Sequence, residues 1–203
     1  MTNNTSIKQT FFDRWAPSYD WLFPSVVYQA IHKRLLEYIN LPASTNVLDL
    51  GCGTGKLLYR LAINFPNLQG TGLDLSPEMI SQANSRNYYP ERLTFLLGNS
   101  EEMPSADEQF DAVFNTISFL HYPHPQQVFN EVSRVLRPGG YFYLVDSYFK
   151  WQDEFQYLSI SPGGLNLYSP TARAKFGQES GLNLQANYYL LGAVLLTIFT
   201  KEL

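Results

Sequence analysis

The stretch VLDLGCGTGK, Val47 to Lys56, holds the residues whose types and spacing most directly suggest chemistry. Gly51, Gly53 and Gly55 occupy alternate positions directly after a run of strand-forming residues. Glycine tolerates positive φ angles and has no Cβ, so backbone N–H groups in such a turn can approach a ligand closely. A glycine turn between a strand and a helix predicts a nucleotide-type site, because α/β sheets bind nucleotides at the carboxyl ends of their strands.

A carboxylate at the end of the next expected strand fits the same site. Asp74 lies 25 residues after Asp49, where it could accept hydrogen bonds from both ribose hydroxyls of a nucleoside above the glycine turn. That geometry would also suit a nicotinamide dinucleotide. The dinucleotide fingerprint is Gly-x-Gly-x-x-Gly, whereas here the third glycine is Gly55 and a lysine follows it. The spacing disfavours a dinucleotide, although a nicotinamide-dependent oxidoreductase stays open as an alternative.

A second set of residues could move a proton. Histidine titrates near neutral pH, and His121 lies just beyond the fourth expected strand. Tyr19, Tyr122 and Asp146 are the other candidates for a general base. His121 fits a structural hydrogen-bonding role equally well, and His124, between two prolines, fits the start of a helix. The spacing of His, Cys and carboxylate residues predicts no metal site.

The elements that must position these residues alternate between strand and helix. Strands are expected at 47–50, 68–75, 93–97, 110–117 and 141–146. Helices are expected at 25–39, beside the cleft, and at 57–65, 76–85 and 128–136. The sequence SPE at 76–78 is typical of a helix start, and RPGG at 137–140 predicts a turn into the fifth strand. This alternation predicts a mostly parallel sheet with helices on both faces.

The C-terminal part breaks the alternation. A helix is expected from 169–171, and two strand-like runs, 184–191 and 194–200, are separated only by Gly192 and Ala193. A link this short joins antiparallel strands, because a parallel crossover needs a dozen residues or more. The sequence therefore predicts an α/β fold whose seven-stranded, mostly parallel sheet ends in an antiparallel hairpin.

Composition limits the possible functions. The 203 residues carry a formal net charge of −4, which argues against nucleic acid as a partner, because phosphate binding normally leaves a basic surface. The N-terminal residues do not resemble a secretory signal, and the longest apolar run, 188–199, is too short for a membrane span. Cys52 is the only cysteine, so no intrachain disulfide is possible and a cytoplasmic setting is expected. Its place between glycines indicates a small residue rather than a reactive thiol.

Several segments, taken in order, resemble the successive motifs of class I S-adenosylmethionine-dependent methyltransferases. These segments are DLGCGTG at 49–55, GLDLS at 72–76, GNSE at 98–101 and FDAVFNTISFLHYPHPQQVFNEVSRVLRPGGYFYLVD at 110–146. The similarity covers roughly 11–146 and is closest to the small-molecule branch that includes the ubiquinone and menaquinone C-methyltransferases. FFDRWAPSYD at 11–20 resembles the N-terminal Tyr-Asp segment that closes over the cofactor in that branch.

The resemblance implies a Rossmann-like fold, S-adenosyl-L-methionine as cofactor and a small-molecule methyl acceptor. It implies one domain over 1–203, with a helical cap at 1–40, a cofactor-binding core at 41–146 and a substrate-side insertion and hairpin at 147–203. Catalytic candidates are His121, Tyr19 and Asp146. Cofactor-binding candidates are Tyr19, Asp49, Gly51, Cys52, Gly53, Gly55, Asp74, Leu75, Met79, Asn99, Ser100, Glu101, Asn115 and Thr116.

The resemblance also implies individual roles. The glycines would pass under the methionine part of the cofactor, with Asp49 facing its amino group. Asp74 would bind the ribose, and Leu75 and Met79 would contact adenine. Asn115 and Thr116 would lie near the cofactor carboxylate and methyl group.

One motif departs from the family pattern. The family often has an aspartate at the position of Asn99, followed by a small residue, here Ser100. An amide oxygen can still accept a hydrogen bond from the adenine amino group, and Glu101 could share that contact. Structural alternatives stay open: Asp74 as a strand-end cap, Asn99 as a turn residue and Asn115 as a satisfied polar group. A cofactor-binding protein without catalysis is a second open alternative.

Aromatic residues make up 15% of the chain, and several follow the fifth strand. Trp151, Phe155 and Tyr157 could line a hydrophobic acceptor pocket. The alternative is a packing helix, because aromatic residues at helical spacing usually belong to a core.

Overall fold

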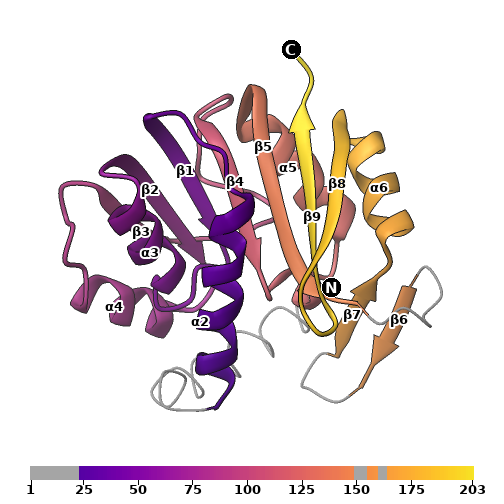
Figure 1. Cartoon of the computed structure of the whole chain (residues 1–203), viewed down its shortest axis with the longest axis horizontal. Helices are drawn as coiled ribbons and strands as arrows, with labels where there is room; N and C mark the ends of the chain where they lie inside the picture. Colours follow the sequence, from indigo (N-terminus) through magenta and orange to yellow (C-terminus); the bar gives the residue numbers. More distant parts are fainter. Residues whose placement is uncertain (1–22, 149–154, 160–163) are drawn as a thin grey trace.

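A seven-stranded sheet in the order β3-β2-β1-β4-β5-β9-β8 forms the centre of the protein (Figure 1). The computed structural model describes residues 23–148, 155–159 and 164–203. The strands are β1 (Ser44–Leu50), β2 (Asn67–Asp74), β3 (Leu93–Leu97), β4 (Phe110–Thr116), β5 (Leu136–Ser147), β8 (Leu182–Leu191) and β9 (Val194–Lys201). The first five pair in parallel, whereas β9 runs antiparallel to both β5 and β8. The predicted fold class and terminal hairpin are therefore confirmed.

Helices cover both faces of the sheet (Figure 1). α2 (Phe23–Leu35), α3 (Lys56–Asn64) and α4 (Pro77–Ser85) pack on one face, and α5 (Pro125–Val135) and α6 (Pro170–Glu179) on the other. Successive side chains of a strand point to opposite faces, so Val47 joins one core and Leu48 the other. This double burial explains why the central strands read as nearly continuous apolar runs.

The helix starts follow from local chemistry. The Ser76 hydroxyl accepts a hydrogen bond from the Met79 N–H at 3.2 Å, and Pro77 occupies the first turn of α4. Ser169 caps α6 in the same way, through the N–H of Ala172 at 3.1 Å. Both starts were predicted, because a serine oxygen satisfies an N–H group that the helix itself leaves unpaired.

Two predicted boundaries are wrong. The helix expected at 25–39 ends at Leu35 and continues as a 3-10 turn, η1 (Leu36–Tyr38). The expected turn at 137–140 belongs to β5, which begins at Leu136, directly after α5. Leu136 pairs with Phe110, and a register shift before Ala112 absorbs the intervening residues. Long-range pairing thus overrides the local turn signal.

The packing helix considered after β5 is wrong for the part of that region that the structure describes. β6 (Phe155–Leu158) and β7 (Leu165–Tyr168) form a separate antiparallel pair. The Tyr157 side chain is 56% exposed and does not line the cleft described below. Trp151 lies outside the described residues.

Candidate functional site

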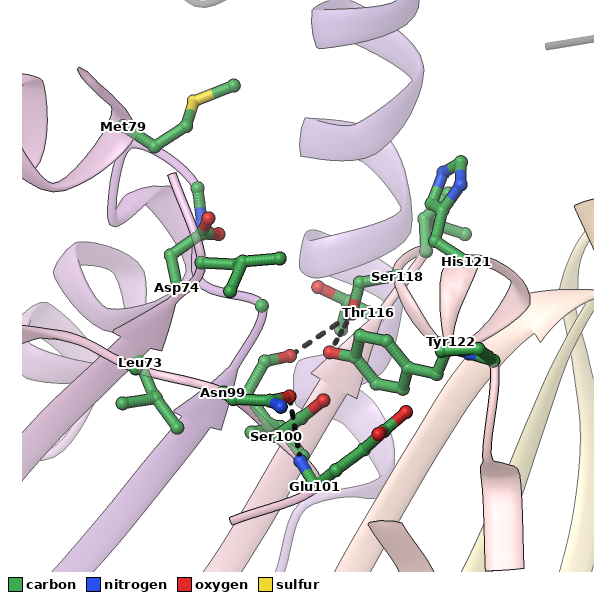
Figure 2. A pocket seen from close by; sticks show the side chains of 17 residues that line it. Leu73, Asp74, Met79, Asn99, Ser100, Glu101, Thr116, Ser118, His121 and Tyr122 are labelled. Atoms are coloured by element: carbon green, nitrogen blue, oxygen red, sulfur yellow. Dashed lines mark hydrogen bonds between the residues drawn. The ribbon is translucent and has the colours of Figure 1, made fainter. Parts of the chain in front are cut away.

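A cleft lies at the carboxyl ends of the parallel strands, where the strand order reverses between β1 and β4. Ligands of open α/β sheets bind at such a switch point. Figure 2 shows Asp74 and Met79 on one side of the cleft and His121 and Tyr122 on the other. The strand ends contribute Leu50, Gly51, Leu73, Asp74, Gly98, Asn99 and Thr116 to its lining.

The backbone of the glycine turn is open to a ligand at one position, Gly53. Gly53 has φ +52°, and a Cβ added there would meet no atom within 4 Å, so the turn faces open space. Gly51 and Gly55 also have positive φ, but a Cβ on Gly51 would collide with Ser118, and one on Gly55 with Phe95. Gly55 is the N-cap of α3 and lies outside the cleft lining, so its role is structural.

Asp74 is held firmly at the cleft edge. One carboxylate oxygen accepts from the Gly53 N–H at 2.8 Å, and the other from the Ser76 N–H at 2.9 Å. A carboxylate oxygen can accept more than one hydrogen bond. Asp74 can therefore fix the glycine turn and accept from ligand hydroxyls at the same time.

A second cavity continues from the cleft on the α2 side. It shares Gly51, Gly53 and Thr116 with the cleft and also contains Asp49 and Cys52. Asp49 is 1% exposed, and its Oδ1 atom has no hydrogen-bond partner among the described residues. Burial, and secondarily the charge of Asp74, raises the pKa of Asp49 to about 8. A cationic ligand group in this cavity, which Lys56 also lines, would find the Asp49 Oδ1 atom and would favour ionisation of that carboxyl group.

Sequence reasoning missed His32, which lines the second cavity. Its Nε2 lies 3.2 Å from the Thr116 hydroxyl, and burial, followed by the charges of Arg60 and Lys56, lowers its pKa to about 3. The imidazole is therefore neutral at physiological pH. The helix was expected beside the cleft, but a single histidine on an amphipathic helix carries no spacing signal that would identify it. Tyr28, one turn earlier on α2, lines the same cavity.

The residues expected around adenine all line the cleft, but two of their polar side chains are already engaged. Leu75 and Met79 offer the expected apolar wall, and Ser100 joins the lining. The Asn99 side-chain oxygen accepts from the Glu101 N–H at 3.0 Å, as in the alternative of a turn residue. The Glu101 carboxylate lies 2.8 Å from His124 Nδ1.

Asn115 lies beneath the cleft floor and does not belong to its lining. Its side-chain amide donates to the Leu50 carbonyl at 2.8 Å, to the Ser118 hydroxyl at 2.8 Å and to the Tyr122 hydroxyl at 3.0 Å. These bonds of the amide nitrogen fit the alternative of a structural polar group, whereas the side-chain oxygen, Oδ1, has no hydrogen-bond partner among the described residues. Burial raises the pKa of Tyr122 above its ordinary range, which favours the protonated phenol and disfavours a role as general base.

The proton-transfer candidates separate in the structure. His121 ends the short helix η2 (Phe119–His121) and lines the cleft. Asp146 is 2% exposed and lies outside the lining; its two oxygens accept from the N–H groups of Leu120 and Ser147 at 2.8 and 2.7 Å. Asp146 thus anchors η2 instead of facing the cleft. Tyr19 lies outside the described residues.

Other chemistry at the site is limited. Cys52 is buried, and its burial raises the pKa of the thiol, as fits a small protonated residue between glycines. The described residues contain no group of three His, Cys, Asp or Glu side chains placed to hold a metal. Within the described ranges, no helix is both long and apolar enough to cross a membrane.

A family model described as a methyltransferase domain matches residues 41–187. The chain belongs to this family. The matched range contains the glycine turn, Asp74 and η2, and so most of the cleft. The predicted family resemblance is confirmed.

Individual curated relatives of this methyltransferase domain are longer than this chain and match only part of it. It is 41% identical over 101 residues to a fatty-acid O-methyltransferase of Mycolicibacterium smegmatis, covering 50% of this chain and 36% of the relative. It is 34% identical over 155 residues to a demethylmenaquinone methyltransferase of Chlorobaculum tepidum, covering 71% and 61%. The chain thus spans less than two thirds of the length of these curated relatives.

A solved structure shares the fold over nearly the whole chain. It is described as a complex between the Haloferax volcanii Trm112 methyltransferase activator and a methyltransferase. The TM-score is 0.80 at 23% identity, with 94% of this chain and 97% of the other covered. At this identity the likeness shows the fold alone.

Proposed function

We propose that this methyltransferase domain binds S-adenosyl-L-methionine and transfers its methyl group to a small-molecule acceptor. One observation carries the proposal: the open backbone at Gly53 faces the Asp74 carboxylate, and the unpartnered Asp49 Oδ1 lies in the adjoining cavity. The cofactor has one part for each feature, because it combines ribose hydroxyls with the cationic ammonium group of its amino-acid end. A dinucleotide pyrophosphate, being anionic, would be a poor match for two carboxyl groups.

Different residues along the site would contact the adenine, the ribose and the amino group of the cofactor. Leu75 and Met79 provide apolar surface for the faces of adenine. Asp74 would accept from the ribose hydroxyls, and Asp49 would face the amino group. The same assignment extends to the backbone of Gly51, Cys52 and Gly53, to Asn99, Ser100 and Glu101 around adenine, and to Thr116 where the two cavities meet.

The bound cofactor supplies a methyl group activated on a positively charged sulfur. The protein then needs chiefly to align the acceptor with that group, and orientation alone can contribute ~7 kcal/mol. His121 lines the cleft, where it could take a proton from an acceptor that must lose one. Asp146 would act as a positioning residue, because it holds the N–H group of Leu120 next to His121.

The comparisons support a small-molecule acceptor. The relatives are named for methylating a fatty acid and a demethylmenaquinone. The net charge of −4 is consistent with an acceptor other than nucleic acid, and a single cysteine is consistent with a reducing cytoplasm. We assign cofactor binding mainly to 41–146, a helical cap to 1–40, and a substrate-side insertion with the terminal hairpin to 147–203.

Isothermal titration calorimetry tests the binding step. S-adenosylhomocysteine and S-adenosylmethionine should bind in a 1:1 ratio, and NADH should not bind. Binding of NADH in place of both would contradict the proposal.

A second measurement separates an enzyme from a binding protein without catalysis. The protein is incubated with S-adenosylmethionine and a panel of small metabolites, and release of S-adenosylhomocysteine is followed. Acceptor-dependent release supports catalysis, whereas tight binding without release from any acceptor would favour a non-catalytic protein.

A further inference from the structure

The part of the cleft on the η2 side is lined by apolar side chains, by the hydroxyls of Ser118 and Tyr122 and by the His121 imidazole. Ile117, Tyr122 and Pro123 line it beside His121. Among the described lining residues there is no lysine or arginine, and the acids are Asp74 and Glu101. Asp74 lies across the cleft (Figure 2), and the Glu101 carboxylate is bonded to His124 at 2.8 Å. On this side of the cleft, the described residues therefore offer a charged acceptor no lysine or arginine, and the His121 imidazole is the one basic group beside it.

Ile117 adopts a backbone conformation that an isoleucine rarely accepts. Its φ is +53°, and within the described ranges only Glu108 shares a positive φ among non-glycine residues. A β-branched side chain at positive φ is strained, and such strain persists only where surrounding contacts fix it. The Ile117 N–H donates to the Val145 carbonyl at 2.8 Å, which fixes the main chain at this point.

The strained turn has a clear structural consequence. Directly after β4 the chain changes direction toward η2, and this brings the Ser118 hydroxyl to 3.1 Å from the Leu50 carbonyl, beneath the glycine turn. Glycine would make the same turn without strain. Isoleucine instead adds a branched apolar side chain that lines the cleft and packs on the core under α2 and α3.

We propose that Ile117 is a specificity-determining residue that forms the apolar wall of the acceptor subsite, and that this subsite takes an uncharged molecule with an apolar body and one polar group beside His121. The inference rests on the proposed function, because it assigns the Asp74 side of the cleft to adenosine. It adds the charge class of the acceptor and the residue that selects its shape.

Three probes that share a naphthalene ring but differ in charge test whether the acceptor is uncharged. 2-Naphthol, 2-naphthoate and 2-naphthylmethylammonium are titrated, by their fluorescence, into protein saturated with S-adenosylhomocysteine at pH 7. The uncharged naphthol should bind at least about tenfold more tightly than either ion, because both ions would lose hydration, the ammonium would find no carboxylate on this side of the cleft, and naphthoate would meet only the His121 imidazole. Equal or tighter binding of an ion, or no binding of naphthol at millimolar concentration, would overturn the inference.

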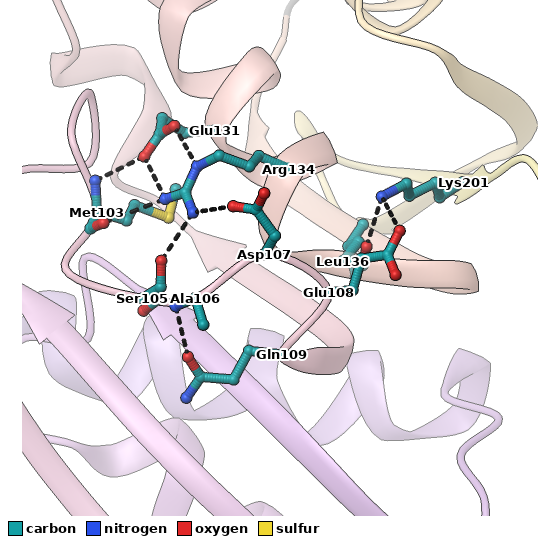
Figure 3. A network of polar contacts seen from close by, with 10 residues as sticks. All are labelled: Met103, Ser105, Ala106, Asp107, Glu108, Gln109, Glu131, Arg134, Leu136 and Lys201. Carbon is teal, nitrogen blue, oxygen red and sulfur yellow. Dashed lines mark hydrogen bonds and ion pairs between the residues drawn. The ribbon is translucent and has the colours of Figure 1, made fainter.

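Matched glycine variants test the residue. Ile117→Gly should weaken naphthol binding by roughly tenfold through lost apolar contact, with unchanged affinity for S-adenosylhomocysteine. Glu108→Gly is the control, because Glu108 also has φ 53° but is exposed at the opposite end of β4, near Arg134 and Lys201 (Figure 3). Undiminished naphthol binding by Ile117→Gly, or the same loss in Glu108→Gly, would overturn the assignment.

The two proposals fail in different ways. If the unsubstituted protein does not bind S-adenosylhomocysteine, the proposed function falls and this inference falls with it. If it binds the cofactor product but prefers a charged probe, only the inference falls. Should Ile117→Gly lose cofactor binding as well, Ile117→Ala, which keeps the Cβ, decides by the same naphthol criterion.

Discussion

Asp49 and Asp74 lie on neighbouring strands, yet their surroundings differ. Asp74 accepts two backbone hydrogen bonds at the cleft edge, whereas Asp49 Oδ1 is buried without a partner in the described part of the chain. The first carboxylate is held in place by backbone N–H groups, whereas a nearby cation would favour ionisation of the second. This difference leads to two separate predictions.

Replacing Asp74 should weaken cofactor binding. Asp74→Ala removes an acceptor for the ribose and for the Gly53 N–H, so the affinity for S-adenosylhomocysteine should fall by about 1–3 kcal/mol. Asp74→Asn, which keeps one acceptor oxygen, should lose less. Calorimetry gives both values, with Asp111→Ala as a control. Asp111 also accepts a backbone N–H, from Asn46 at 2.7 Å, but lies at the opposite end of the strands. Unchanged affinity in Asp74→Ala would remove Asp74 from the site.

Asp49 should make the stability of the ligand-free protein depend on pH. Its pKa is about 8 in the folded protein against an ordinary value of 3.8, so the folded state holds a proton that the unfolded chain releases. The stabilising contribution is complete below about pH 4 and is lost as the pH rises toward about 8. Asp49→Asn removes this titration.

The measurement is urea unfolding of both proteins at pH 5, 6 and 7. The free energy of unfolding of the unsubstituted protein should fall relative to Asp49→Asn by up to ~1.4 kcal/mol per pH unit. Asp146, whose burial raises its pKa to about 6, is present in both proteins and cancels in the comparison. Parallel pH profiles would show that Asp49 is ionised in the folded state.

At the scale of elements, the short connections after the strands build the site. η2 is tied to β5 through Asp146 and to the glycine turn through Ser118 and Asn115. α4 begins at Ser76, directly after Asp74, and carries Met79 into the cleft. The position of each cleft residue therefore depends on how firmly its helix is anchored.

A matched pair of helix caps tests that dependence. Ser76→Ala and Ser169→Ala each remove a side-chain acceptor at a helix start, so each should lower the free energy of unfolding by about 1 kcal/mol. Only Ser76→Ala should also weaken binding of S-adenosylhomocysteine, because only α4 contributes to the cleft lining. Urea unfolding and calorimetry measure the two effects. Equal affinities in the two variants would mean that α4 does not position the site.

At the scale of the whole molecule, Arg173 connects the C-terminal elements to the parallel sheet. It is 1% exposed, and burial lowers its pKa to about 10. Its guanidinium donates to the carbonyls of Tyr168, Leu195 and Asp146 and to the Thr197 hydroxyl, at 3.1–3.3 Å. One side chain thus joins α6 to β5, β7 and β9.

Removing this connection should be costly for stability. Arg173→Met leaves three buried carbonyls with fewer partners and should lower the free energy of unfolding by about 3 kcal/mol. Arg137→Met is the control, because Arg137 is 43% exposed and pairs with Asp111 at the surface, where an ion pair contributes about 1 kcal/mol or less. Urea unfolding measures both. A similar loss in the two variants would contradict the role assigned to Arg173.

The sequence by itself determined the fold class, the helix starts at Ser76 and Ser169, and the glycine turn with Asp74. These features depend on local rules, because side-chain period, cap chemistry and the positive φ of glycine act within a few residues. The family motifs added a list of residues expected near the glycine turn. They did not say which of those residues face the cleft.

Only the tertiary structure decided how those neighbours are used. It brought His32 to Thr116 across 84 residues and placed Asn115 beneath the floor, where it bonds to Leu50 across 65 residues. It also strained Ile117 at the cleft wall. Each outcome depends on contacts between segments far apart in the chain. The local sequence around a polar side chain does not show whether such a distant contact satisfies it or whether it stays available to a ligand.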